Sequence, residues 1–401
     1  MKYLFLTLTI FYSLTTFSQE EETIEKKWNT DYGTEVEIEN QFFLNEGIYD
    51  GQRQYFLSAA LKPFFMAESI DNRHSFSVSL FCRLSASDPR RSHFDVREAF
   101  YRYEKNNWSV SLGSKKVFWG VTELAHLVDI VNQTDFLEGF DGEEKLGQPM
   151  LQITTSQSFG NFEAYYLPFS RRLSFPSRFG RYRFPVVLET NDIPFRNEQE
   201  QWYPSFAARW YKTLAGFDLG ISAFHGTSRE PLYLGFNPIS GLDLSYPIIN
   251  QLGLDVQYLF ENWLFKTEAI YRTTQLQDFF AIISGFEYTF GNVKNSGLDI
   301  GLVSEYIYDS RKLLTFSGLD NDVFVGTRLA FNDTKNTEML VGGVFDVEKS
   351  TKLFSIEASR RIGNSFKVNL QGNILSQVSD KEVLYNFRQD DFIQISISKF
   401  F

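Results

Sequence analysis

Apolar and polar residues alternate along most of the chain, from about residue 34 to the C-terminus. In 76–84, 263–271 and 366–371, for example, the side chains at every second position are mostly apolar. Because successive side chains of a strand point to opposite faces, this period predicts strands with one apolar and one polar face. Each segment is about 9–13 residues long, which matches the roughly 9–11 residues that a tilted strand needs to cross a membrane.

Counting the alternating segments gives about eighteen strands. An even number leaves both termini on one side of the membrane, as in single-chain bacterial barrels. The alternation is weak in 35–45 and 161–168, so sixteen strands remain an alternative. The predicted strands are 35–45, 53–67, 74–85, 95–105, 107–117, 149–158, 161–168, 202–212, 215–225, 249–260, 262–273, 278–290, 297–309, 321–332, 336–347, 352–362, 365–376 and 390–401.

The apolar faces of such strands can meet either a protein core or lipid. In a soluble sandwich they would pack together, whereas in a membrane barrel they face lipid and the polar faces line the lumen. Aromatic residues gather at strand ends, where interfacial girdles form. Short connections such as 261–262 and 363–364 alternate with long ones such as 118–148 and 169–200. These features predict an all-β fold, a transmembrane antiparallel β-barrel over residues 34–401.

The N-terminus predicts export. Lys2 precedes an apolar stretch at 4–17, which is shorter than the roughly 20 residues that a membrane-spanning helix needs. This arrangement is typical of a secretory signal peptide. We therefore expect a signal peptide at 1–18, a periplasmic stub at 19–33 and an integral protein of the outer membrane of Gram-negative bacteria.

Composition and charge narrow the function classes. The 401 residues include 39 Lys and Arg and 50 Asp and Glu, for a net charge of −11. An acidic chain argues against nucleic acid as a partner. A single cysteine, Cys82, allows no intrachain disulfide and no cysteine-based zinc site. The four histidines are scattered, and no nucleophile-elbow or phosphate-loop motif occurs. The sequence therefore predicts no enzyme, no cofactor and no metal.

The segment 117–140 contains the most distinctive motif of the chain. It resembles the loop motif W-G-x-x-(D/E)…D-x-x-N-P-x-D of an uncharacterised family of porin-like outer-membrane β-barrel proteins, with Gln133 at the proline position. The resemblance extends over most of the mature chain and implies a barrel, but it does not identify a transported solute. The matching residues are Trp119, Gly120, Glu123, Asp129, Asn132 and Asp135.

The last predicted strand also resembles a known signature. Ile393, Ile395, Ile397 and the terminal Phe401 share one face, as in the C-terminal strands of outer-membrane barrel proteins. This resemblance implies that strand 390–401 is recognised by the barrel-assembly machinery. The other expected partners are outer-membrane lipid, lipopolysaccharide and small solutes.

The loop 118–148 is predicted to be partly helical, because its apolar residues between 124 and 131 fall on one helical face. Barrels of sixteen to eighteen strands enclose a channel, which a loop folded inward would narrow. The alternative is a surface loop whose tryptophan joins the outer girdle. We expect the constriction to involve acidic loop residues and charged wall residues, namely Trp119, Glu123, Asp129, Asn132, Asp135, Lys115, Lys266, Glu268, Arg272 and Arg328.

A second long loop is rich in arginine and aromatic residues. Arginines beside exposed rings can bind an anionic sugar or lipopolysaccharide, although acidic residues follow closely and can neutralise the loop. The candidate ligand residues are Arg171, Arg172, Arg178, Arg181 and Arg183. The sequence thus favours a porin-like channel for small solutes, narrowed by loop 118–148. The alternatives are a plugged barrel that binds surface glycans and, less favoured, a barrel hydrolase.

Overall fold

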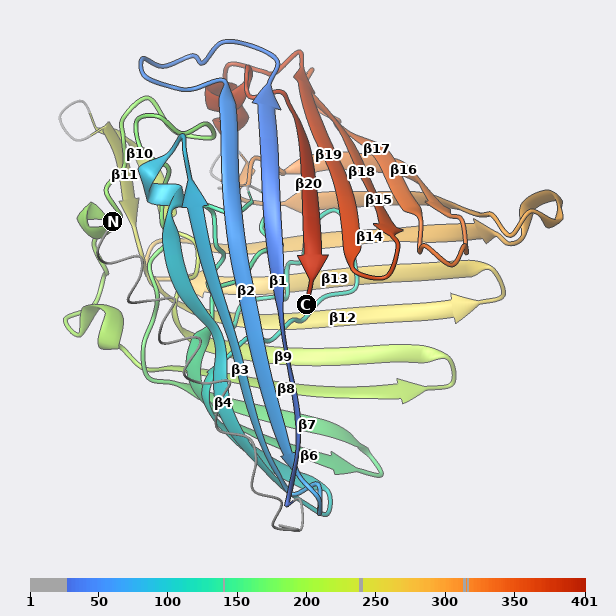
Figure 1. Cartoon of the computed structure of the whole chain (residues 1–401). Helices are drawn as coiled ribbons and strands as arrows, with labels where there is room; N and C mark the ends of the chain where they lie inside the picture. Colours follow the sequence, from blue (N-terminus) through green and yellow to red (C-terminus); the bar gives the residue numbers. More distant parts are fainter. Residues whose placement is uncertain (1–26, 140, 238–240, 313–314, 316) are drawn as a thin grey trace, which may run out of the picture.

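The computed structural model describes residues 27–401 except 140, 238–240, 313–314 and 316. Eighteen antiparallel strands form one sheet, which closes because β1 pairs with both β2 and β20 (Figure 1). The predicted barrel of eighteen strands is therefore confirmed. Its strands are β1 (Trp28–Phe43), β2 (Tyr55–Ser69), β3 (His74–Ser85), β4 (His93–Lys105), β5 (Trp108–Lys115), β6 (Gln148–Gln157), β7 (Gly160–Leu167), β8 (Ser205–Leu214), β9 (Phe217–Thr227), β12 (Ile248–Phe260), β13 (Trp263–Thr274), β14 (Asp278–Phe290), β15 (Asp299–Asp309), β16 (Asn321–Ala330), β17 (Glu338–Asp346), β18 (Lys352–Ile362), β19 (Phe366–Ser376) and β20 (Phe392–Phe400).

The two rims of the barrel differ in their connections. One rim, here called the short-turn rim, has connections such as 106–107 and 261–262 and also holds the C-terminus, since Phe400 pairs with Glu35 near the start of the barrel. The opposite, long-loop rim has the longest connections, which are 116–147, 168–204 and 228–247. Short inner turns and long outer loops are the arrangement of bacterial outer-membrane barrels.

Smaller elements lie in the connections. A separate two-stranded sheet of β10 and β11 belongs to the connection between β9 and β12. No helix in the described part of the chain is both long and apolar enough to span a membrane. The additional elements are β10 (Leu232–Asn237), β11 (Gly241–Ser245) and the 3-10 helices η1 (Pro89–Arg91), η2 (Thr190–Asp192), η3 (Glu200–Trp202), η4 (Val293–Asn295) and η6 (Val383–Phe387).

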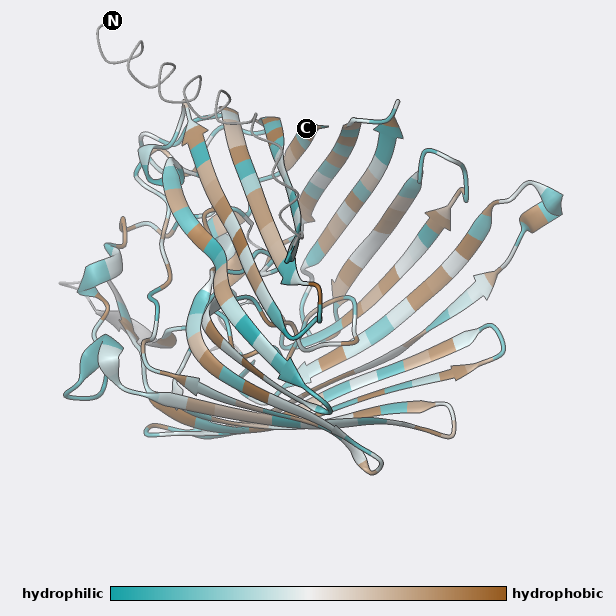
Figure 2. Cartoon of the chain, turned by 60° about the horizontal axis from the view of Figure 1, so that its bottom comes forward, coloured by the Kyte–Doolittle hydropathy of each residue, from teal (hydrophilic) through white to brown (hydrophobic). Residues whose placement is uncertain are grey.

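The period of two in the sequence separates the outer and inner faces of the wall. In β20, Ile393, Ile395 and Ile397 are each 47% exposed on the outside, whereas Ser396 and Ser398 are buried inside. Figure 2 shows hydrophobic and hydrophilic residues alternating in this way along many strands. The apolar outer face suits lipid, and the polar inner face surrounds the lumen.

The N-terminal boundary differs from the expected one. β1 begins at Trp28 and pairs with β2 from there onward, so residues 28–33 of the predicted stub belong to a strand. They extend beyond the last pair between β1 and β20, Glu35 with Phe400. The predicted signal peptide at 1–18, and the stub as far as residue 26, lie outside the described residues.

Lysine in place of Ile397 should destabilise the folded barrel in lipid. Ile397 faces outward in the middle of its ladder, between Ile38 and Val368. A lysine on the lipid face costs about 2–4 kcal/mol near the midplane. Urea titration of the protein refolded in lipid vesicles measures this loss.

The matched control is Gln394→Lys, on the same strand but lining the lumen. It should leave the free energy of unfolding nearly unchanged. Equal losses in the two variants would show that the apolar face does not meet lipid.

Candidate functional site

The connection 116–147, called the inserted loop below, packs inside the barrel against the wall. Glu268 of β13, which is 0% exposed, holds one part of it. Its carboxylate accepts backbone N–H bonds from Val121 at 2.7 Å, Thr122 at 3.1 Å and Val128 at 3.1 Å. Hydrogen bonds to an ionised acceptor are stronger than neutral ones, so one wall carboxylate fixes three points of the loop.

Glu305 of β15 holds the next residues in the same way. Its carboxylate accepts the backbone N–H groups of Glu123 and Leu124, each at 2.8 Å. These N–H groups point at the wall and do not form helical bonds along the chain. The described residues of the inserted loop contain no helix, so the prediction of a partly helical loop was wrong. The apolar residues between 124 and 131 pack against the wall in an irregular conformation.

Asn132 ties the two ends of the inserted loop together. Its side-chain oxygen accepts the N–H of Val117 at 2.9 Å. Its side-chain nitrogen donates to the carbonyl oxygens of Lys115 and Leu146, both at 2.9 Å. All three hydrogen bonds join Asn132 to backbone groups at the two ends of the inserted loop. This motif asparagine therefore fixes the conformation of the loop.

Trp119 lies inside the barrel and not in an outer girdle, since only 1% of it is exposed. Its ring lies 5.7 Å from the ring of Tyr165, and the guanidinium of Arg209 lies 5.6 Å from its ring centroid. Close packing also depends on Gly253 of β12, where a Cβ atom would lie 3.1 Å from Cγ1 of Val128. The loop can therefore lie directly on the wall.

Two acidic residues of the loop pair with cations. Asp135 binds Arg97 at 2.6 Å and His93 at 3.1 Å. Burial alone would raise the pKa of the Asp135 carboxyl, but His93 and Arg97 outweigh it and hold the pKa below its usual range. Asp129 lies 3.2 Å from Lys145. Here burial outweighs the lysine and raises the pKa of the Asp129 carboxyl.

Arg83 of β3 is the centre of a buried ion-pair network. Only 3% of its side chain is exposed, and it lies 2.9 Å from Glu37, 3.3 Å from Glu39 and 2.7 Å from Glu138 of the inserted loop. Removing one partner of such a network leaves an uncompensated buried charge, which typically costs about 3–5 kcal/mol. The network fixes the far arm of the loop against β1 and β3.

The remaining candidate residues divide between the loop and the wall. Glu123 of the loop lies 2.6 Å from Arg328 and 3.9 Å from Lys266, so an acidic loop residue does meet basic wall residues inside the barrel. Lys115 and Arg272 instead bind other wall and rim groups. The structure thus brings together most of the predicted set around the inserted loop.

The acidic turn of the inserted loop, residues 138–144, lies where three cavities meet. A vestibule of about 620 Å³ extends toward the short-turn rim and includes Arg328, Glu338 and Lys367 in its wall. Smaller cavities of about 80 Å³ and about 210 Å³ lie toward the long-loop rim. Asp141 lines all three cavities. The acidic turn therefore separates the vestibule from the two smaller cavities.

The long outer loops share an apolar core. Buried side chains come from the inserted loop and from the connections 168–204, 228–247 and 377–391. This packing joins four loops of the long-loop rim into one body. Its buried residues are Phe136, Leu173, Phe175, Phe184, Ile193, Phe195, Leu244, Tyr246, Leu384 and Phe387.

Most of the arginines proposed as ligand residues make internal contacts. Arg171 pairs with Asp95 at 2.6 Å, and the buried Arg181 pairs with Asp390 at 2.6 Å. Arg172 and Arg183 donate to backbone carbonyl oxygens of the outer loops. Arg178 lies 4.8 Å from the ring centroid of its neighbour Phe179. The donors of this loop are thus directed mainly into the protein.

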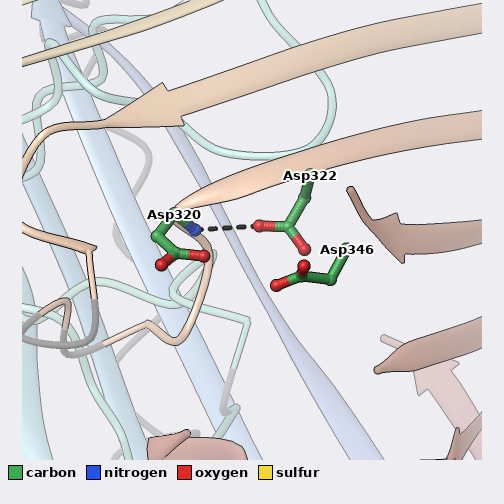
Figure 3. A group of neighbouring side chains, drawn as sticks. All are labelled: Asp320, Asp322 and Asp346. Carbon is green, nitrogen blue, oxygen red and sulfur yellow. Dashed lines mark hydrogen bonds between the residues drawn. The ribbon is translucent and has the colours of Figure 1, made fainter. Parts of the chain in front are cut away.

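Three aspartates at the long-loop rim form the acidic cluster drawn in Figure 3. Carboxylate oxygens of Asp320, Asp322 and Asp346 lie within 4.8 Å of one another, and the N–H of Asp320 donates to Asp322 at 2.8 Å. Lys349 places its ammonium 3.0 Å from Asp320 and 2.9 Å from Asp346. Because a lysine already supplies the positive charge, we assign no metal to this cluster.

Solved structures show what this fold is similar to. Wzi, an outer-membrane protein involved in group 1 capsule assembly in Escherichia coli and described as a carbohydrate-binding β-barrel, aligns with a TM-score of 0.54 and 10% identity over 92% of this chain and 84% of that chain. A porin mutant of Rh. blastica aligns at 0.46 and 11% over 93% and 100%, and OmpT of Vibrio cholerae at 0.43 and 10% over 93% and 99%. No family model and no curated protein matches the chain. The fold is that of a closed outer-membrane β-barrel.

Sequence reasoning missed two groups of site residues. The acidic turn was not among the predicted constriction residues, although its carboxylates Asp141, Glu143 and Glu144 stand out in a loop already expected in the lumen. Arg229 and Glu230 follow the end of β9 and also line a cavity. They lie in a connection where no period of two marks an inward position.

The stability of the docked loop should depend on His126. Its Nε2 lies 3.1 Å from Glu143, and its Nδ1 lies 3.9 Å from Glu268. Burial alone would lower the pKa of His126, but the two carboxylates outweigh it and raise the pKa to about 10. An unfolded histidine has a pKa of about 6.5. The stabilisation is therefore complete below about pH 6.5 and is lost as the pH rises through about 10.

We expect the melting temperature of the detergent-folded protein to fall more steeply between these pH values than that of His126→Gln. Circular dichroism melts at several pH values provide the measurement. Parallel pH profiles for the two proteins would show that His126 carries no such linkage.

Proposed function

We propose that the chain is a porin-like outer-membrane channel through which small polar solutes diffuse, with the inserted loop narrowing the path. The supporting observation is the position of Asp141 in the wall of all three cavities. In this proposal a solute moving from the 620 Å³ vestibule toward the long-loop rim passes this side chain. The apolar outer face of the strands supports a place in the membrane.

In this proposal the wall and the loop have different roles. Glu268 and Glu305 hold the loop, and the network around Arg83 holds its far arm. The acidic turn itself is less constrained, since Asp141 and Glu144 are exposed and form no ion pair in the described structure. Charged side chains of this kind set the ion preference of a pore. The chain is proposed to act without catalysis.

Conductance recording tests the channel. The refolded full chain in a planar bilayer should give discrete current steps, and deletion of 121–144 should enlarge them because the acidic turn is removed. A correctly folded but silent preparation would overturn the proposal. An unchanged step in the deletion variant would overturn the role of the loop.

A charge-reversal variant tests whether the path of permeating ions passes Asp141. Asp141→Lys should shift the reversal potential in a KCl gradient toward chloride, because a side chain that lines all three cavities changes sign. Asp192→Lys makes the same change on an exposed residue of an outer loop and should leave the potential unchanged. An equal response of the two variants would contradict a path past the acidic turn.

A second candidate function is binding of surface glycans by a closed barrel. Two observations favour it: the apolar core shared by four outer loops and the fold similarity to Wzi. A rigid outer surface suits recognition because little conformational entropy is lost on binding.

Intact cells displaying the protein should then bind specific glycans on an array. Replacing residues 238–240, which follow β10 in the sequence, with Gly-Ser-Gly should reduce this binding at least tenfold without changing heat-modifiable migration. Discrete conductance combined with no glycan binding would exclude this candidate.

A further inference from the structure

The cavity of about 210 Å³ on the long-loop side of the inserted loop is the most site-like feature outside the vestibule. It is smaller than the roughly 300–1,000 Å³ of pockets for drug-sized ligands, so any occupant is a small molecule. Much of its wall is apolar and comes from both the loop and the barrel, including Leu127, Ile270 and Ile307. The rest of the lining is polar or charged, and most of its charged side chains pair with one another.

Arg229 supplies one of these polar groups. Its Nε donates to the carbonyl oxygens of Ile130 and Val131 at 3.2 Å and 3.1 Å, and one terminal nitrogen donates to Ser170 at 3.1 Å. The other terminal nitrogen has no hydrogen-bond partner. Burial lowers the pKa of Arg229 to about 10, so it stays charged at neutral pH. Only 6% of the residue is exposed.

The other buried cations around this cavity are neutralised. Lys145 pairs with Asp129. Arg272 and Arg311 share the carboxylate of Glu230, each at 2.8 Å, and Arg311 also pairs with Asp309.

Arg229 differs from these residues because it forms no ion pair within the described chain. Its guanidinium lies 5.2 Å from the ring centroid of Phe224, but this ring and the nearby carbonyl dipoles carry no full negative charge. Asp141, which also lines the cavity, is exposed and belongs to the path described above. A buried cation without a counter-charge favours an anion beside it.

Gln133 supplies the second polar group. The residue is 1% exposed, and its side-chain Oε1 atom has no hydrogen-bond donor. A buried acceptor without a donor is unfavourable, and an O–H group of a ligand would satisfy it. The cavity therefore combines a donor that prefers an anion, an acceptor that needs a hydroxyl and an apolar wall.

We propose that this cavity binds a small hydroxylated carboxylate, of the sugar-acid class. The carboxylate lies on the free nitrogen of Arg229, a hydroxyl donates to Gln133, and the carbon skeleton packs against Leu127, Ile270 and Ile307. The site goes beyond the channel proposal, because binding does not require conduction. If the barrel also conducts solutes, the site identifies sugar acids as a class of solute that binds within the channel.

Isothermal titration calorimetry on the full chain folded in detergent tests the site with sodium glucuronate as the probe. Glucose lacks the carboxylate and butyrate lacks the hydroxyls, so each should bind at least tenfold more weakly. Gln133→Leu should weaken glucuronate binding at least tenfold, since it removes the side-chain oxygen that would accept the hydroxyl. Gln157→Leu, at the short-turn end of β6, should bind as the wild type does.

Arg229→Lys keeps the charge but removes the free guanidinium nitrogen. This variant should also bind glucuronate at least tenfold more weakly. If this variant does not fold, Gln133→Leu and the comparison of the three ligands still test the proposed binding site. Absence of glucuronate binding, or equal binding of glucose, would overturn the proposal. Conductance of the same preparation separates the two hypotheses: steps without binding exclude the site alone, and binding without steps excludes the channel alone.

Discussion

Two buried wall carboxylates accept hydrogen bonds from backbone N–H groups, and the arrangement of the barrel interior depends on this interaction. A loop inside a barrel is not paired in a β-sheet, yet its buried N–H groups need hydrogen-bond acceptors. Glu268 and Glu305 provide them for five residues of the inserted loop. Each such group left unpaired would cost about 1–3 kcal/mol. The wall thus dictates an irregular backbone where the loop's own pattern favours a helix.

The ion pairs at the other arm of the loop have a different effect. Buried ion pairs contribute little net stability, because desolvation offsets the Coulomb attraction. Arg83 with Glu138, and Arg97 with Asp135, are better understood as fixing position. They hold the side of the acidic turn that precedes Asp141, and Arg97 also donates to the carbonyl oxygen of Lys145 at 3.0 Å on the other side. Asp141 thereby remains in the lining of all three cavities.

The sequence predicted the strands of the barrel wall far better than the conformation of the loop inside the barrel. A period of two is imposed by the two faces of each strand, so the eighteen strands and the inward side of Glu268, Glu305 and Arg328 followed from it. The conformation of the loop did not, because it depends on acceptors about 140 to 180 residues away in sequence. Trp119 illustrates the same limit: its neighbours Tyr165 and Arg209 come from other strands.

The seam between β1 and β20 has a consequence for biogenesis. Ser398 donates to Glu35 at 2.6 Å across 363 residues of sequence, and all closing contacts have comparable separations. Contacts so distant along the chain form slowly. Until the last strand arrives, two long edges with unpaired backbone groups remain open and prone to aggregation. The chain must therefore be kept from aggregating until its last strand pairs, since no partial length of it can close the sheet.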